Sequence, residues 1–149
     1  MREEIDTCKW LREIGEPVDN SLRLVIEEAK ADGPPEDREL LPGKIVSGLR
    51  SIESDRACRL FEIEWPSYVA NSVRDERFTQ IDNDEVWRGR LFCEFSKSHF
   101  LEYVKRATFA SADYPGLLRH WGINCLNHIV DVVSTVEPQI RCTVGRKLF

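Results

Sequence analysis

A chain of 149 residues has the size of one domain, and we expect residues 1–149 to form a single α+β domain. Hydrophobic residues make up 42% of the chain and charged residues 32%, which excludes the apolar-poor composition of disordered proteins. No apolar run approaches the roughly 18 residues of a membrane helix, and the N-terminus lacks a secretory pattern, so we expect a soluble, cytoplasmic protein with no membrane association.

The charged residues are unevenly distributed along the sequence. The formal net charge is −5, and residues 1–64 carry 10 basic and 16 acidic side chains, whereas residues 65–149 carry 11 basic and 10 acidic ones. An acidic front half repels phosphate backbones, which argues against nucleic-acid binding. It suits a basic protein partner instead.

The five cysteines are scattered, and no two form a CxxC pair. Neither a zinc ribbon nor a redox motif is therefore indicated. We expect reduced thiols in a cytosolic protein, several of them acting as small core residues.

The first elements are a helix and a strand. Residues 3–14 carry apolar side chains at near-helical spacing and precede Gly15, which predicts a short N-terminal helix. Residues 22–30 fit both the two-residue alternation of a strand and one face of a helix. The β-branched pair Val25 and Ile26 favours the strand.

The next segments alternate between loops and strands. Residues 32–43 combine prolines, glycines and charges and predict a mobile loop. Residues 60–65 alternate in polarity as a strand, and after Pro66 residues 68–73 form a second strand or a bulged continuation of the first. A turn is expected over 81–85.

The second half begins with a strand over 91–95 and a helix at about 97–107. Ser96 or Ser98 can cap this helix by accepting an unpaired backbone N–H of its first turn. Its apolar stripe predicts one buried face.

The last elements are predicted as a hairpin over 118–134, with a helix from Cys125 onward as the competing interpretation. The tail 139–149 either adds an edge strand or is frayed. Since few helices alternate with strands, we expect a mainly antiparallel sheet with an N-terminal helix and the helix at 97–107.

One cluster of chemically capable residues lies near the end of the chain: His120, Cys125, His128 and Asp131. These types suit zinc or a cysteine–histidine pair, but the spacing matches no recognised site. A strand end with a satisfied histidine is the simpler interpretation. Asp131 between two valines must face water or find a partner.

Two further candidates precede that cluster. Arg74 and Glu76 lie in an Arg-Asp-Glu-Arg run that follows a predicted strand, where a solvated strand end is the simpler interpretation. Ser98 and His99 open the predicted helix. Capping accounts for the serine, and His99 can reach a neighbouring anion.

A candidate binding surface follows residue 81. It combines three carboxylates with an aromatic residue, namely Asp82, Asp84, Glu85 and Trp87. Tryptophan is frequent among interface hot spots, and Trp87 stands between acidic and basic neighbours that favour partial exposure.

No phosphate-binding loop, metalloprotease motif, calcium loop or nucleophile elbow occurs, so we predict no cofactor and no metal. The leading hypothesis is a non-enzymatic protein-binding module, a small adaptor or inhibitor of which an immunity protein is one example. The alternative is a small enzyme or ligand-binding domain with a cleft formed by His99, His120, His128, Asp131, Arg74 and Glu76. A third possibility is a subunit or homodimer that pairs through sheet edges.

Overall fold

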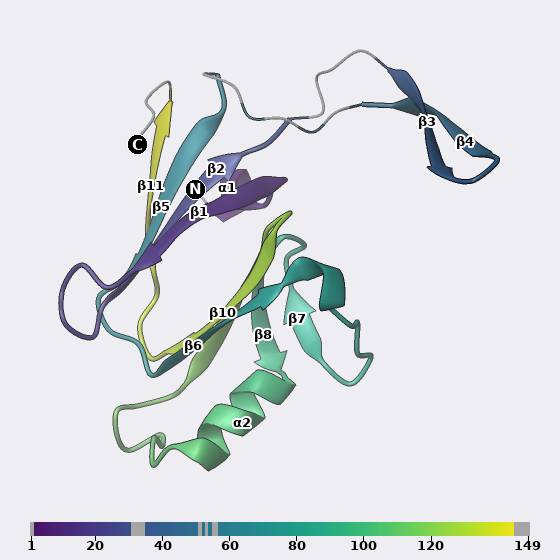
Figure 1. The fold of residues 1–149 in the computed structure, drawn as a ribbon. Helices are drawn as coiled ribbons and strands as arrows, with labels where there is room; N and C mark the ends of the chain where they lie inside the picture. The colour runs from purple at the N-terminus through teal and green to yellow at the C-terminus, as the bar shows by residue number, and fades with distance from the viewer. Residues whose placement is uncertain (1, 31–34, 51, 53, 55–56, 145–149) are drawn as a thin grey trace.

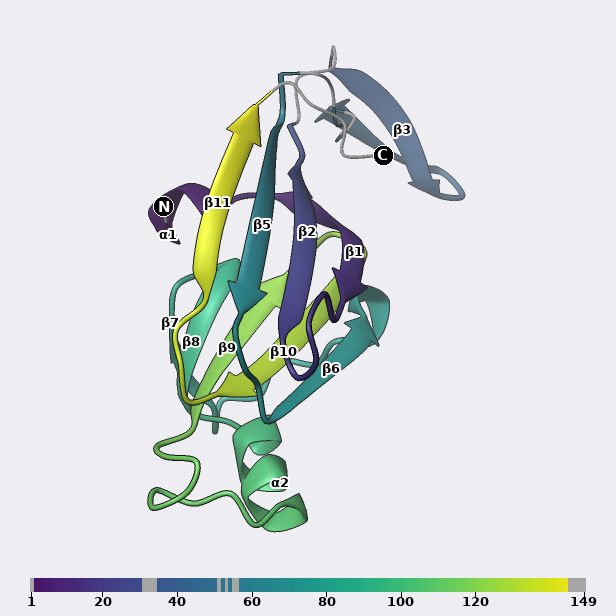
Figure 2. The same cartoon turned by 90° about the vertical axis from the view of Figure 1, so that its left-hand side faces the viewer.

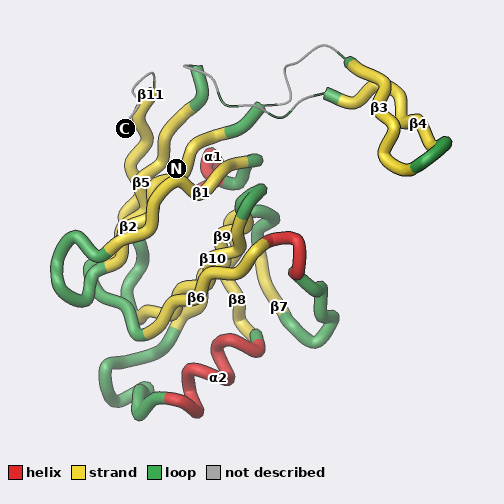
Figure 3. Tube along the Cα trace, viewed as in Figure 1, coloured by secondary structure: helices red, strands yellow, loops and turns green. Residues whose placement is uncertain are grey.

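The protein, seen in a computed structural model, is described over residues 2–30, 35–50, 52, 54 and 57–144. Within these ranges strands predominate, and helical turns occur at α1, η1 and α2 only (Figure 3). No helix in the described part of the chain is long and apolar enough to cross a membrane.

Two antiparallel sheets face each other (Figures 1 and 2). The first has the order β1 (Lys9–Gly15), β2 (Leu22–Glu28), β5 (Arg59–Trp65) and β11 (Gln139–Val144). The second has the order β6 (Ala70–Asp75), β10 (His128–Ser134), β9 (Arg119–Asn124), β8 (Phe92–Lys97) and β7 (Val86–Arg88). The remaining elements are the helices α1 (Arg2–Ile5), η1 (Glu76–Phe78) and α2 (His99–Ala107) and the hairpin of β3 (Glu36–Leu41) and β4 (Lys44–Leu49).

The core lies between the two sheets. Alternate residues of each inner strand point into it, such as Ile63 and Trp65 of β5 and Trp121 and Ile123 of β9. Trp65 and Trp121 meet edge to face across the sheets, with ring centroids 6.0 Å apart. An aromatic pair of this kind contributes about 0.5–1.5 kcal/mol beyond the area it buries.

The outer face of the second sheet carries α2 (Figure 1). Leu101 and Val104 of the helix pack against Leu118 and Val133. Because inner and outer side chains alternate along a strand, His120 and Asp131 point to this outer face, beside the helix. The fold therefore places them where α2 begins.

The predicted fold class is confirmed, with mainly antiparallel sheets and two α-helices. The strand interpretation of 22–30 and the strand over 60–65 are also confirmed. So is the hairpin over 118–134, which consists of β9 and β10. The helix expected at about 97–107 begins at His99 and is capped by Ser98. The segment after Pro66 forms β6, which belongs to the opposite sheet.

The N-terminal helix is much shorter than predicted, since it ends at Ile5 and residues 9–15 form β1. The Asp6 carboxylate accepts the backbone N–H groups of Leu91 and Phe92, which directs the chain away from helical continuation and toward the second sheet. Pairing of β1 with β2 then outweighs the helical spacing of the side chains.

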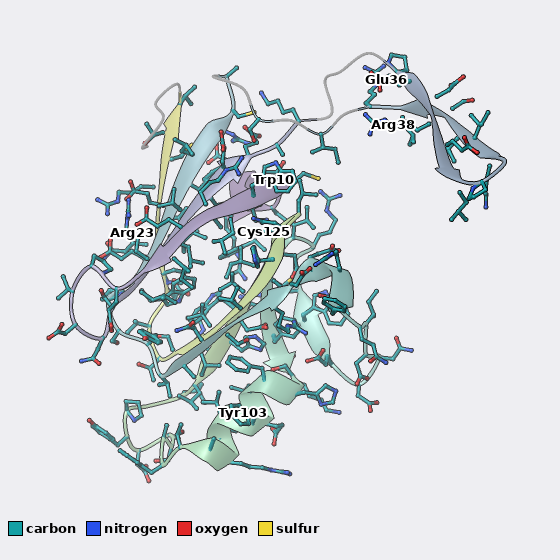
Figure 4. The ribbon with its side chains drawn as sticks, viewed as in Figure 1. Trp10, Arg23, Glu36, Arg38, Tyr103 and Cys125 are labelled. Carbon is teal, nitrogen blue, oxygen red and sulfur yellow. The ribbon has the colours of Figure 1, made fainter. Side chains whose placement is uncertain are left out.

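The loop prediction for 32–43 is wrong for Glu36–Leu41, which pairs with Lys44–Leu49; residues 32–34 lie outside the described residues. Gly43 adopts φ +76° and closes the turn between the two strands. The hairpin stands apart from both sheets, as Glu36 and Arg38 show in Figure 4. The tail forms the edge strand β11 up to Val144, and residues 145–149 are not described.

We predict that Cys8 will react with a thiol reagent faster than Cys93 and Cys125. Cys8 is exposed, whereas Cys125 lies in the core (Figure 4), where burial raises the pKa of its thiol to about 12. Burial likewise raises the pKa of Cys93 to about 11. Because the thiolate is the reactive form, Cys8 should be labelled first and Cys93 and Cys125 only after denaturation, as mass spectrometry of the labelled native chain can show. Labelling of Cys125 as fast as Cys8 would contradict this core.

Candidate functional site

A pocket of about 390 Å³ opens on the outer face of the second sheet, beside the first turn of α2. Strands β6, β8, β9 and β10, the helix and the loop before β7 all contribute to it. Its lining consists of Ser72, Arg74, Gln80, Asp82, Glu85, Phe95, His99, Phe100, His120 and Asp131. A pocket of this size is within the range that holds small ligands or a protruding side chain.

His120 lies at the base of the pocket and is 1% exposed. Its Nδ1 lies 2.6 Å from Ser98 Oγ, and its Nε2 lies 2.7 Å from Asp131 Oδ1. Both ring nitrogens therefore have a partner, as a buried imidazole requires. The two contacts tie the start of α2 to β9 and β10.

Ser98 has two roles in this network. Its Oγ accepts the backbone N–H of Leu101 at 3.0 Å and so caps α2. A hydroxyl that accepts there can donate its own proton to His120 Nδ1, and Nε2–H then donates to Asp131. In this arrangement each side-chain hydrogen-bonding group of Ser98 and His120 has a partner, from the helix cap to the Asp131 carboxylate.

Asp131 connects the buried imidazole to the surface. Its side chain is 6% exposed, and Oδ2 accepts from Arg74 Nη2 at 3.2 Å and from Ser72 Oγ at 3.4 Å. The guanidinium of Arg74 is about half exposed, so the network ends at solvent. The carboxylate among valines thus has three partners, which offset the cost of burying it.

An aromatic wall stands over His120. The Phe95 ring stacks on the imidazole with centroids 4.4 Å apart, and Phe100 meets it edge-on at 5.4 Å. A Cβ atom at Gly122 would lie 2.7 Å from the Phe95 ring, so glycine is needed for this ring to lie over β9. The stacked rings fix the imidazole plane and keep water from its faces.

The loop before β7 forms the opposite rim. Glu85 Oε2 accepts the backbone N–H of His99 at 3.1 Å, and Asp82 Oδ2 lies 2.6 Å from His99 Nε2. The contact with Asp82 raises the pKa of His99 above its usual 6.5. The pKa of Asp82 is lowered, first by the Asp84 backbone N–H and then by His99.

Four of the six residues predicted for a cleft line this one pocket: Arg74, His99, His120 and Asp131. The other two lie elsewhere. His128 begins β10 opposite Asp75, and its buried Nδ1 has no hydrogen-bond partner. Glu76 begins η1, where its backbone N–H donates to Asn127.

The residues predicted for a binding surface lie next to the same pocket. Asp82 and Glu85 line it, while Asp84 is exposed on the adjoining turn. Trp87 is 44% exposed, and its ring centroid lies 5.9 Å from that of Phe95. The two separately predicted sets of residues therefore share one region of the surface.

Sequence reasoning missed Ser72, Phe95 and Phe100, which enter the pocket through strand order and helix packing. It also missed Phe78, at the end of η1, and Ile81, which follows the pocket-lining residue Gln80; each is 80% exposed. Their exposure could have been predicted from the sequence, because a turn-rich, acidic segment does not pack against the core and leaves its apolar side chains in solvent.

The Ser98–His120–Asp131 chain is suited to holding structure rather than to nucleophilic attack. In a catalytic triad the serine must reach a substrate, but Ser98 is buried and its oxygen already serves as helix cap and imidazole partner. Among the residues described, no three histidine, cysteine, aspartate or glutamate side chains come together in a way that could hold a metal ion.

Comparison with known proteins adds no assignment: no family model, no curated protein and no solved structure matches this chain.

We predict that Asp131→Ala will lower the free energy of unfolding by about 1–3 kcal/mol, because it leaves the Nε2–H of buried His120 without an acceptor. Urea denaturation monitored by tryptophan fluorescence measures this. Asp113→Ala, at an exposed position, is the matched control and should change stability by less than about 0.5 kcal/mol. Equal effects of the two substitutions would contradict a role for the network in stability.

Proposed function

We propose that this chain is a non-enzymatic protein-binding module that recognises a basic partner through residues 78–87. The observation that carries the proposal is the surface of this segment. Four large apolar side chains are exposed there: Phe78 and Ile81 at 80%, Val86 at 53% and Trp87 at 44%. The carboxylates of Asp82, Asp84 and Glu85 lie between Ile81 and Val86 in the sequence, and the segment contains no lysine or arginine.

This composition resembles that of a binding surface more than that of an ordinary loop. Several exposed apolar side chains within one segment are typical of interaction sites, and aromatic residues supply much of the binding energy at interfaces. Carboxylates around them speed the encounter with a basic partner and fix its orientation. The net charge of −5 acts in the same direction over longer distances.

A non-enzymatic role agrees with the state of the buried network. Ser98, His120 and Asp131 are engaged with one another and with the cap of α2, so their hydrogen-bonding groups already have partners. An inhibitor of the immunity type, which blocks a basic target by covering it, is one concrete form of such a module. The thiols of Cys8, Cys93, Cys125 and Cys142 are free, which supports a reducing cytoplasm as its location.

A second candidate function is the binding of a small polar ligand in the pocket. The observation in its favour is the convergence of Arg74, His99, His120 and Asp131 on one cavity with aromatic walls. The guanidinium, imidazole and carboxylate groups offer both donors and acceptors, as sites for polar ligands do.

We predict that Phe78→Ser combined with Ile81→Ser will weaken association with the partner by roughly thirtyfold or more, since loss of an interface hot spot costs at least about 2 kcal/mol. The partner is isolated from lysate of the source organism at low and moderate salt, and its affinity for each variant is measured by titration calorimetry. The control is Phe109→Ser with Leu117→Ser, which removes side chains that are 87% and 74% exposed in another loop. A partner that binds both double variants equally would contradict this surface.

The carboxylates have a separate test. Asp84→Asn with Glu85→Gln should reduce the dependence of affinity on salt, because two charges that attract a basic partner are removed. An unchanged salt dependence would show that these carboxylates do not face the partner.

The pocket hypothesis predicts that small polar molecules screened by two-dimensional NMR will shift the His120 and Arg74 side-chain signals. Arg74→Gln should abolish the shifts of the His120 signals, while Arg106→Gln, at an exposed position of α2, should leave them unchanged. A screen whose hits perturb signals only outside the pocket would count against the second candidate.

A further inference from the structure

Residues 79–85 form one wall of the pocket, because Gln80, Asp82 and Glu85 line it from this loop. Figure 1 shows the loop between η1 and β7, next to the point where α2 begins. Its side chains do not anchor it by apolar packing, since Ile81 is 80% exposed. The wall must therefore be held by polar contacts.

Those polar contacts converge on His99. Asp82 Oδ2 lies 2.6 Å from His99 Nε2, and Glu85 Oε2 accepts the His99 backbone N–H at 3.1 Å. The other hydrogen bonds of residues 79–85 in the described structure stay within the loop or reach the adjoining η1, as from Thr79 N–H to Glu76 O. One residue of α2 thus attaches the loop to the helix.

We propose that residues 79–85 are a lid on the pocket, closed by the ion pair between Asp82 and His99 and opened when that ion pair is lost. The role of this lid in recognition rests on the proposed function, because the same loop carries part of the partner-binding surface. In the closed lid, His99 engages the carboxylates of Asp82 and Glu85; in the open lid, both are free for a basic partner.

The surroundings of His99 give the lid a pH dependence. The loop presents three carboxylates to His99, those of Asp82, Asp84 and Glu85. Its own helix contributes Glu102 and Arg106. The sheet contributes Arg74, His120 and Asp131, which lie across the pocket from His99. Lys97 of β8 acts on Asp82. The nearest groups are the loop carboxylates, and they favour protonated His99.

The direction of the pH effect follows from the two pKa shifts. Closure raises the pKa of His99 above 6.5, so its contribution to closure is complete below about pH 6.5 and is lost as pH rises through the raised pKa. The pKa of Asp82 is lowered below 3.8 first by the Asp84 N–H within the loop and then by His99; the contribution of His99 is complete above about pH 3.8 and is lost as pH falls through the lowered pKa. The lid is therefore most firmly closed in mildly acidic solution and opens toward alkaline pH.

The test is amide hydrogen exchange of the isolated chain by NMR between pH 5.5 and 8.5, with each rate divided by its intrinsic value at that pH. The His99 amide reports the lid because it donates to Glu85, and the Val104 amide in the middle of α2 reports the fold. We expect protection of His99 to decline with rising pH while that of Val104 stays constant.

Three variants show whether the ion pair between Asp82 and His99 causes the pH dependence of the His99 amide protection. Asp82→Asn retains an oxygen for the Asp84 N–H but loses its charge, and should leave the His99 amide unprotected throughout the range. His99→Gln should give a protection at position 99 that does not vary with pH. Asp113→Asn, the matched control at an exposed position in another loop, should behave as the unaltered chain does.

Protection of the His99 amide that is constant with pH in the unaltered chain, or that persists in Asp82→Asn, would overturn the lid. Because these measurements contain no partner, they stay decisive even if the Phe78 and Ile81 substitutions prove that the partner binds elsewhere.

Discussion

The hydrogen bonds of the buried His120 imidazole are the interaction on which the functional face depends. One nitrogen contacts the serine that caps α2, and the other contacts Asp131, which in turn holds Arg74 at the surface. A buried polar group left without a partner costs about 1–3 kcal/mol, so the helix, two central strands and an edge strand are held in a single arrangement. The pocket is the space that this arrangement leaves open.

The same interaction limits what the face can do. It engages Ser98, the serine beside His120, in structural hydrogen bonds, and it leaves an aromatic wall and a set of charged side chains facing outward. The loop that carries the exposed apolar residues closes against this rigid base through His99. On these grounds we propose recognition rather than covalent chemistry for this face of the protein.

Much of the fold follows from local patterns. The alternation over 60–65, the apolar stripe and cap of α2, and the β-branched run of β10 each specify one element, because burial of one face decides it. The strand over residues 9–15 could not be predicted from its local pattern. Its helical spacing is overridden by pairing with β2 and by contacts such as that of the buried Lys9 Nζ with the Leu91 carbonyl, 2.9 Å away.

The candidate site could be predicted only in part. Strand alternation puts His120 and Asp131 on the face opposite the core, but the presence of Arg74 beside them depends on β6 pairing with β10, across 57 residues of chain. Sequence spacing contains no such information. Sequence spacing also grouped His128 with His120, although His128 is three positions from Asp131 along β10 and therefore lies on the opposite face of the sheet from the pocket.

The most direct test of the account is site-specific photocrosslinking in lysate of the source organism, with a photoreactive amino acid placed at position 81 or, for comparison, at position 117. Both positions are exposed, so labelling depends on the partner alone. The account predicts that position 81 captures one basic protein and that position 117 does not. Capture of that protein from position 117 and not from position 81 would contradict the assignment of the binding surface.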